Sequence, residues 1–359
     1  MRILDRYLLR QFVVTFVFAT GALLSIFIVI DLFERLDKFI DNKLSASVLV
    51  QFYAALVPSY LELLIPIALL LAGLFSVGRL SNNNEITAIR SSGRSTFRLL
   101  LPILAFALIM SGAQVYFNGW IAPAAATARF DLERRYLGSD AGRGSLSDLS
   151  FRETPTLNVL LQHYDETRKK ASGVSIEEYG SAMQPRMVWK VVADSMLWVD
   201  SVAGWVVPVG VRWTFGTDSI QMERIEQWQA PFTVRHHQIV KLQLNPDEMT
   251  FPELDDYIKT LKRGGRDTRV REIDLAGQWA FPFVNLIVVL ISVPFASIKR
   301  RGGLATNIAA AMVLAITYIA FTKISQAMGA ASNLPVEVVA WSANAIFFIV
   351  GLVVLRRAR

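Results

Sequence analysis

Long stretches without a charged side chain are the feature that most restricts how this chain can fold. Phe12 to Ile30 is nineteen such residues, and Leu99 to Ala128 is thirty. At a helical rise of about 1.5 Å per residue, either run can cross a hydrocarbon layer about 30 Å thick. Four further apolar runs raise the number of predicted membrane spans to six: Phe52 to Gly78, Leu275 to Ile298, Leu304 to Thr322 and Val336 to Leu355.

The composition agrees with a membrane protein. Hydrophobic residues make up 53% of the 359, and the mean hydropathy is +0.39, which is typical of integral membrane proteins. Basic residues precede the first span, as in a signal peptide, but the apolar run is long and no clear cleavage site precedes Asp31. We therefore interpret it as an uncleaved span, and we expect a short interfacial helix between Asp31 and Ser47.

The net charge of +7 is confined to the membrane part. Residues 129–272 contain 20 Lys and Arg against 21 Asp and Glu, whereas the rest of the chain contains 17 against 9. No basic domain exists, which argues against nucleic-acid binding. With the N-terminus in the cytoplasm, thirteen basic residues lie in the inner loops and termini. This predicts that both termini are cytoplasmic and that residues 129–272 are outside. The chain has no cysteine, so this exported part needs no disulfide.

From Gly138 to Asp247 the hydrophobic pattern changes from helical to alternating. Short runs separated by turn residues predict an all-β domain, either an antiparallel sandwich or an open barrel, with Trp189, Trp198, Trp205 and Trp213 mostly in its core. The runs are Asn158 to Tyr164, Met187 to Asp194, Met196 to Asp200, Gly204 to Val207, Val211 to Phe215 and Phe232 to Val240.

Thr250 and Glu253 have the spacing of a capping box, which predicts a return helix ending at Gly264. We therefore divide the chain into spans one to three (1–128), a β-domain with its return helix (129–272) and spans four to six (273–359).

The polar loop from Arg79 to Arg98 lies between the second and third spans. Asn82 and Glu85 have capping-box spacing, and Gly93 is placed to end a helix, so we expect a helix of about ten residues from Asn83 to Ser92. Such a helix could be a docking element for a partner, and a solvated turn is the alternative.

The chain lacks the motifs of common catalytic sites. It has no G-x-x-x-x-G-K-[ST] loop for nucleotide phosphates, no G-x-S-x-G and no H-E-x-x-H. His236 and His237 would point to opposite faces of a strand, which disfavours a shared metal. We therefore predict no enzymatic activity, metal or cofactor in this chain. Glu62, inside the second span, is either a coupling carboxylate or a paired structural residue, and we favour the second interpretation.

The order of these segments resembles that of the lipopolysaccharide-export ABC permeases, the LptF/LptG family. Four motifs carry the resemblance: ILDRYLLRQF at the start, NEITAIRSSGRS between spans two and three, WIAP at Trp120 to Pro123, and the return segment LDDYIKTLKRGG. The resemblance covers almost the whole chain, and the terminal segments look more similar to the LptG branch. It implies six transmembrane helices with a periplasmic β-jellyroll-like domain between helices three and four, in the bacterial inner membrane.

The resemblance also implies a function and a set of partners. The chain would be a half-permease that extracts lipopolysaccharide and passes it to a periplasmic bridge. It would pair with LptF, with a dimer of an LptB-like ATPase that uses ATP and Mg, and with LptC-like and LptA-like jellyroll proteins. The loop near 82–93 would be the coupling helix that contacts the ATPase. Its candidate residues are Glu85, Ile86, Ile89, Arg90 and Arg94.

Lipopolysaccharide carries phosphates, which Arg and Lys bind by charge-assisted hydrogen bonds. The candidates near the outer interface are Lys38, Arg129, Arg134, Arg135 and Lys323. Each could instead be an interfacial anchor. Two other functions stay open: transmission of motion to a periplasmic partner without lipid passage, and ion-coupled transport through Glu62.

Overall fold

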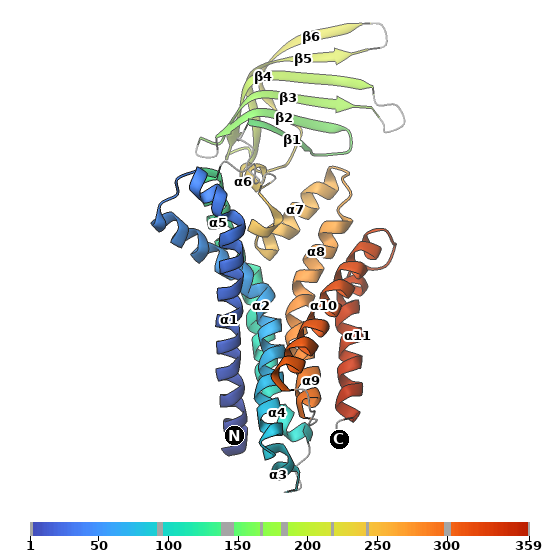
Figure 1. The fold of residues 1–359 in the computed structure, drawn as a ribbon. Helices are drawn as coiled ribbons and strands as arrows, with labels where there is room; N and C mark the ends of the chain where they lie inside the picture. The colour runs from blue at the N-terminus through green and yellow to red at the C-terminus, as the bar shows by residue number, and fades with distance from the viewer. Residues whose placement is uncertain are drawn as a thin grey trace. The chain divides into compact units, whose positions relative to one another are not determined.

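The computed structural model describes residues 3–91, 96–137, 147–165, 168–180, 186–216, 219–241, 244–297 and 303–357. The chain divides into two compact units, one made of residues Met1–Leu132 and Arg269–Arg359 and the other of residues Glu133–Thr268. The first unit is helical, and the second is built around a β-sheet (Figure 1).

Six stretches of helix in the described residues are long and apolar enough to cross a membrane, which confirms the predicted spans. The helices that provide them are α1 (Ile3–Asp41), α2 (Ala46–Asn82), α4 (Thr96–Tyr116), the π-helical turn η1 (Phe117–Ile121), α5 (Ala122–Tyr136), α8 (Arg269–Ala280), the 3₁₀ turn η3 (Phe281–Phe283), α9 (Val284–Ser297), α10 (Gly303–Ala330) and α11 (Val336–Arg357). The short helix α3 (Glu85–Ser91) follows α2.

The separate interfacial helix expected after the first span does not form, because α1 continues to Asp41. Asp31 is only 7% exposed, and its carboxylate accepts hydrogen bonds from Arg35 Nε at 3.0 Å and from the Tyr53 hydroxyl at 3.1 Å. Tyr53 lies on α2. Because these two hydrogen bonds offset the cost of burying the Asp31 carboxylate between α1 and α2, α1 can continue through this residue.

Helices α2 and α9 approach each other closely at Gly73. A Cβ atom at this position would lie 2.1 Å from Ser292 Oγ, so only glycine fits without a shift. Small residues permit such contacts between membrane helices. The surrounding core is apolar, with Leu69, Leu74 and Val289 fully buried.

The second unit contains one six-stranded antiparallel sheet in which each strand pairs with the next in sequence (Figure 1). The strands are β1 (Ser147–Arg152), β2 (Leu157–Asp165), β3 (Lys170–Tyr179), β4 (Met187–Val199), β5 (Gly204–Phe215) and β6 (Ile220–Gln229). The register places Ile176 opposite Val159 on one side and Val191 on the other, and all three are 0% exposed. The β-domain is thus confirmed, and its described strands form a single sheet and not two facing ones.

The observed strands differ from the predicted runs in number and in length. The four runs between Met187 and Phe215 form only two long strands, and β1, β3 and β6 were not predicted. Phe232 to Val240, predicted as a strand, instead leads into helix α6 (His236–Lys241). The alternation there comes from Phe232 and Val234, which are buried in the sheet core, while the Gln238 side chain accepts a hydrogen bond from the Arg235 N–H at 2.8 Å.

Of the four tryptophans expected in the core, Trp205 alone is 0% exposed, and its Nε1 donates to Val234 O at 2.7 Å. Trp189 and Trp198 are partly buried against the same core, and Trp213 has intermediate exposure.

The return helix is confirmed as α7 (Phe251–Arg263), preceded by the 3₁₀ turn η2 (Pro246–Glu248). Glu253 accepts bonds from the Thr250 N–H at 3.0 Å and the Thr250 hydroxyl at 2.8 Å, which forms the expected capping box.

The contact at Gly73 generates a stability prediction. Gly73→Ala forces α2 and α9 apart and is expected to destabilise the helical unit by about 1–3 kcal/mol, the usual cost of overpacking. Gly21→Ala is the matched control, because nothing lies within 4 Å of a Cβ atom at Gly21. Thermal unfolding of the purified chain in detergent measures the difference, and equal melting temperatures for the two variants would contradict the close contact.

Candidate functional site

The loop after α2 contains a helix, as expected, but a shorter one. α2 extends to Asn82, and α3 covers seven residues, Glu85–Ser91. Asn84 separates them in a left-handed conformation (φ 60°), which asparagine adopts more readily than most residues. Ser92 and Gly93 lie outside the described residues.

The predicted capping box between Asn82 and Glu85 does not form. Helix α2 continues through Ser81 and ends at Asn82, so Asn82 is not the residue that precedes α3. Glu85 is therefore the first residue of α3, where a negative charge is favourable. Its Oε2 accepts a hydrogen bond from the Tyr7 hydroxyl at 3.0 Å, and its Oε1 accepts one from the Asn83 side-chain amide at 3.3 Å. The first bond connects α3 to α1.

Helix α3 packs against the helical unit through its two isoleucines. Ile86 is 3% exposed and belongs to the main buried cluster, and Ile89 packs against that cluster. Thr87 and Ala88 are exposed and form the outer surface of the helix. Neither size nor polarity distinguishes these two residues in the sequence, so no sequence pattern indicated them. The Arg90 side chain and all of Arg94 lie outside the described residues.

A network of polar side chains lies inside the helical unit, next to Pro66 of α2. A proline has no N–H, so the carbonyl four residues earlier, that of Glu62, has no donor in the helix. Gln114 of α4 supplies one, with its Nε2 donating to Glu62 O at 2.7 Å. Asn285 of α9 donates in turn to Gln114 Oε1 at 2.6 Å. The Gln114 side chain thus joins helices α2, α4 and α9.

The carboxylate of Glu62 is engaged in the same network. Its Oε1 accepts a hydrogen bond from Asn118 Nδ2 at 3.0 Å. Asn118 lies in the π-helical turn η1 and is 5% exposed. A π-helical turn changes the direction in which side chains point, which here places Asn118 next to α2. This pairing agrees with the interpretation of Glu62 as a structural residue.

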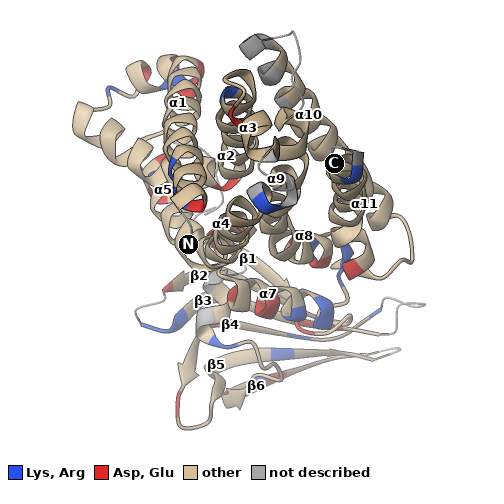
Figure 2. Cartoon of the chain, turned by 90° about the horizontal axis from the view of Figure 1, so that it is seen from below, with Lys and Arg blue, Asp and Glu red and all other residues tan. Residues whose placement is uncertain are grey.

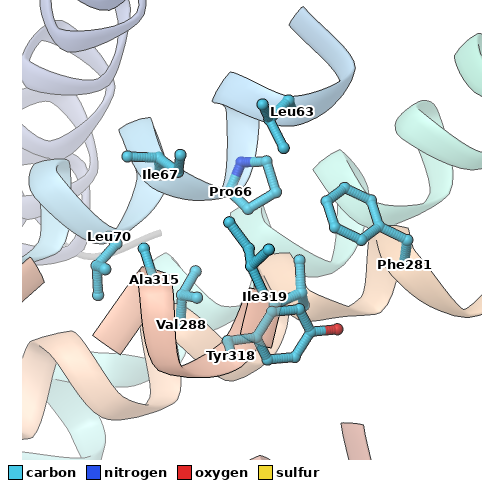
Figure 3. A pocket seen from close by; sticks show the side chains of 10 residues that line it. Leu63, Pro66, Ile67, Leu70, Phe281, Val288, Ala315, Tyr318 and Ile319 are labelled. Atoms are coloured by element: carbon cyan, nitrogen blue, oxygen red, sulfur yellow. The ribbon is translucent and has the colours of Figure 1, made fainter. Parts of the chain in front are cut away.

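An apolar pocket of about 330 Å³ lies beside this network, among α2, η3, α9 and α10 (Figure 3). Its only side-chain oxygen is the Tyr318 hydroxyl, which donates to Asn344 Oδ1 at 2.8 Å. Figure 3 shows Pro66 and Ile319 facing each other across this space. The lining residues are Leu63, Pro66, Ile67, Leu70, Phe281, Val284, Val288, Ala315, Tyr318 and Ile319. A lining of this kind favours contact with apolar groups.

The structure separates the five basic candidates by what they contact. Arg134 donates to Glu248 Oε1 at 2.7 Å, and the two side chains are 12% and 0% exposed. This buried ion pair holds α5 to η2, and removing the arginine would leave an unpaired buried charge. Its partner is 114 residues away in sequence, so no local pattern could reveal it.

Of the other four basic candidates, Arg129 has intermediate exposure and a buried Nε, and the remaining three are more accessible. The Arg129 guanidinium lies 4.3 Å from the centre of the Phe130 ring. Lys38, Arg135 and Lys323 are exposed. Figure 2 marks the basic residues in blue, including those at the end of α11 beside the carboxyl terminus.

Comparison with protein families identifies the family of this chain. The family model described as "Lipopolysaccharide export system permease LptF/LptG" matches residues 6–357 of the chain. No curated protein matches.

The network at Pro66 generates a prediction that a double-mutant cycle can test. Gln114→Leu leaves the Glu62 carbonyl and the Asn285 amide without partners, which is expected to cost about 1–3 kcal/mol of stability. In a Pro66→Leu background the helix supplies its own N–H, so Gln114→Leu should cost clearly less. Denaturant unfolding of the four proteins measures the coupling, and purely additive effects would contradict the role assigned to Gln114.

Proposed function

The chain belongs to the LptF/LptG family of lipopolysaccharide export permeases, and from this membership we propose that it extracts lipopolysaccharide from the inner membrane and passes it to a periplasmic bridge. ATP hydrolysis in a partner subunit drives this movement. The chain itself is a multi-pass inner-membrane protein without a catalytic role.

The proposal depends most on the attachment of α3. Because Ile86 is buried in the main core while Thr87 and Ala88 are exposed, a partner that pushes on the outer surface also moves the helices behind it. The Tyr7 hydroxyl of α1 also donates to Glu85 at 3.0 Å, but the coupling does not require this bond. We assign α3 as the coupling helix, with Glu85, Thr87 and Ala88 facing the ATPase. Ile86 and Ile89 transmit the motion inward, and Arg90 and Arg94 flank the contact.

Lipid contact is assigned to two kinds of surface. The apolar pocket among α2, α9 and α10 accommodates part of an acyl chain. The exposed cations Lys38, Arg135 and Lys323 bind phosphates of the lipid head group, and Arg129 assists from its position over Phe130. Arg134 is removed from this set, because its charge is already paired with Glu248.

The orientation and the partners complete the proposal. Both termini and α3 are cytoplasmic and the β-domain is periplasmic, which follows from the excess of basic residues on one side. The chain resembles LptG, so its paralogous partner is LptF. An LptB-like ATPase dimer uses ATP and Mg, and LptC-like and LptA-like jellyroll proteins receive the lipid. No cofactor is assigned to this chain.

Charge reversal at Glu85 tests the coupling assignment. Glu85→Arg is expected to leave the complex assembled and hydrolysing ATP while lipid release falls at least tenfold, because the carboxylate at the partner contact is lost. The measurement is lipopolysaccharide release per ATP hydrolysed in proteoliposomes.

Tyr7→Phe is the matched control, since it removes the bond from α1 to Glu85 but keeps the carboxylate. Near-normal release is expected for this control. If Tyr7→Phe lost as much release as Glu85→Arg, Glu85 would be a structural residue and the assignment would be wrong.

A further inference from the structure

The β-sheet unit contains an open pocket of about 360 Å³ between β1 and α7. Polar and apolar residues share its lining, unlike the pocket in the helical unit. The lining residues are Ser150, Phe151, Arg152, Tyr257, Thr260, Leu261, Gly264 and Arg266. None of them is an Asp or Glu.

Two glycines directly after α7 let this part of the pocket lining pack closely on β1 and on the residues that follow it. A Cβ atom at Gly264 would lie 2.5 Å from the carbonyl oxygen of Arg152, so the end of α7 touches the β1 backbone directly. Gly265 has a left-handed conformation (φ 70°) and packs on Pro155. Because α7 is also anchored through Leu254, which is 1% exposed, the two sides of the pocket are held at a defined spacing.

The charges of this pocket come from two arginines in its lining, Arg152 on β1 and Arg266 after α7. No described residue forms a hydrogen bond or an ion pair with either guanidinium. The neighbouring carboxylate of Glu153 is turned elsewhere, since its Oε1 accepts bonds from the Thr233 N–H at 3.1 Å and the Thr233 hydroxyl at 2.7 Å. Among the described residues that line the pocket there are therefore two positive charges and no carboxylate.

We propose that this pocket binds a phosphate monoester. A doubly charged phosphate has enough oxygens to accept bidentate hydrogen bonds from both guanidinium groups, whereas a carboxylate has only two oxygens. The hydroxyls of Ser150 and Tyr257 lie in the same lining and can donate to a further oxygen. The phosphate belongs either to a lipid head group or to a free small molecule.

The test measures equilibrium binding to the purified full chain in detergent, so it does not depend on transport or on an ATPase. One arm titrates inorganic phosphate by calorimetry. The other arm compares lipopolysaccharide with its enzymatically dephosphorylated form. Both are repeated with Arg152→Gln, Arg266→Gln and the double variant. Arg224→Gln is the matched control, because this exposed arginine of β6 pairs with Glu226 and is absent from the pocket lining.

Each single variant is expected to weaken phosphate binding about tenfold or more, and the control is expected to leave it unchanged. Loss of binding in both arms identifies a head-group site, and loss only with inorganic phosphate identifies a free-phosphate site. Arg152→Lys should also bind more weakly, since it keeps the charge but loses the fork. Wild-type binding in neither arm, or binding that the double variant retains while its circular dichroism is native, would overturn the proposal.

Discussion

Inside a membrane every backbone N–H and C=O must find a partner within the protein, and each proline inside a helix makes this condition harder to meet. Pro66 leaves the Glu62 carbonyl without its helical donor, and Gln114 replaces that donor at 2.7 Å. Asn285 then satisfies Gln114. Helices α2, α4 and α9 are consequently bound to one another by a few buried polar groups, beside a pocket that is otherwise apolar.

This arrangement supports the proposal that motion of α3 is passed to the membrane helices. Ile86 of α3 is buried in the same core, and at Gly73 helix α2 packs directly on the Ser292 side chain of α9. A displacement of α3 therefore reaches the packed helices directly, since tightly packed interiors transmit strain well. The proposed acyl-chain pocket is lined by the helices that such a displacement would shift.

Sequence reasoning succeeded where the signal is local and failed where it depends on distant partners. Long apolar runs predicted the six spans, and the spacing of Thr250 and Glu253 predicted the start of α7. The equivalent spacing at Asn82 was misleading, because α2 continues through that residue. The family could be predicted from the order of short motifs, whereas the pairing of Arg134 with Glu248 could not, since 114 residues separate the two.

The central claim is that this chain is moved by hydrolysis in another subunit. The most direct test reconstitutes the chain and its paralogous permease in liposomes containing lipopolysaccharide, with a jellyroll acceptor outside, and measures lipid transfer to the acceptor. Transfer should occur only when the ATPase subunit and Mg-ATP are both present. Equal transfer by the permease pair alone would contradict the account.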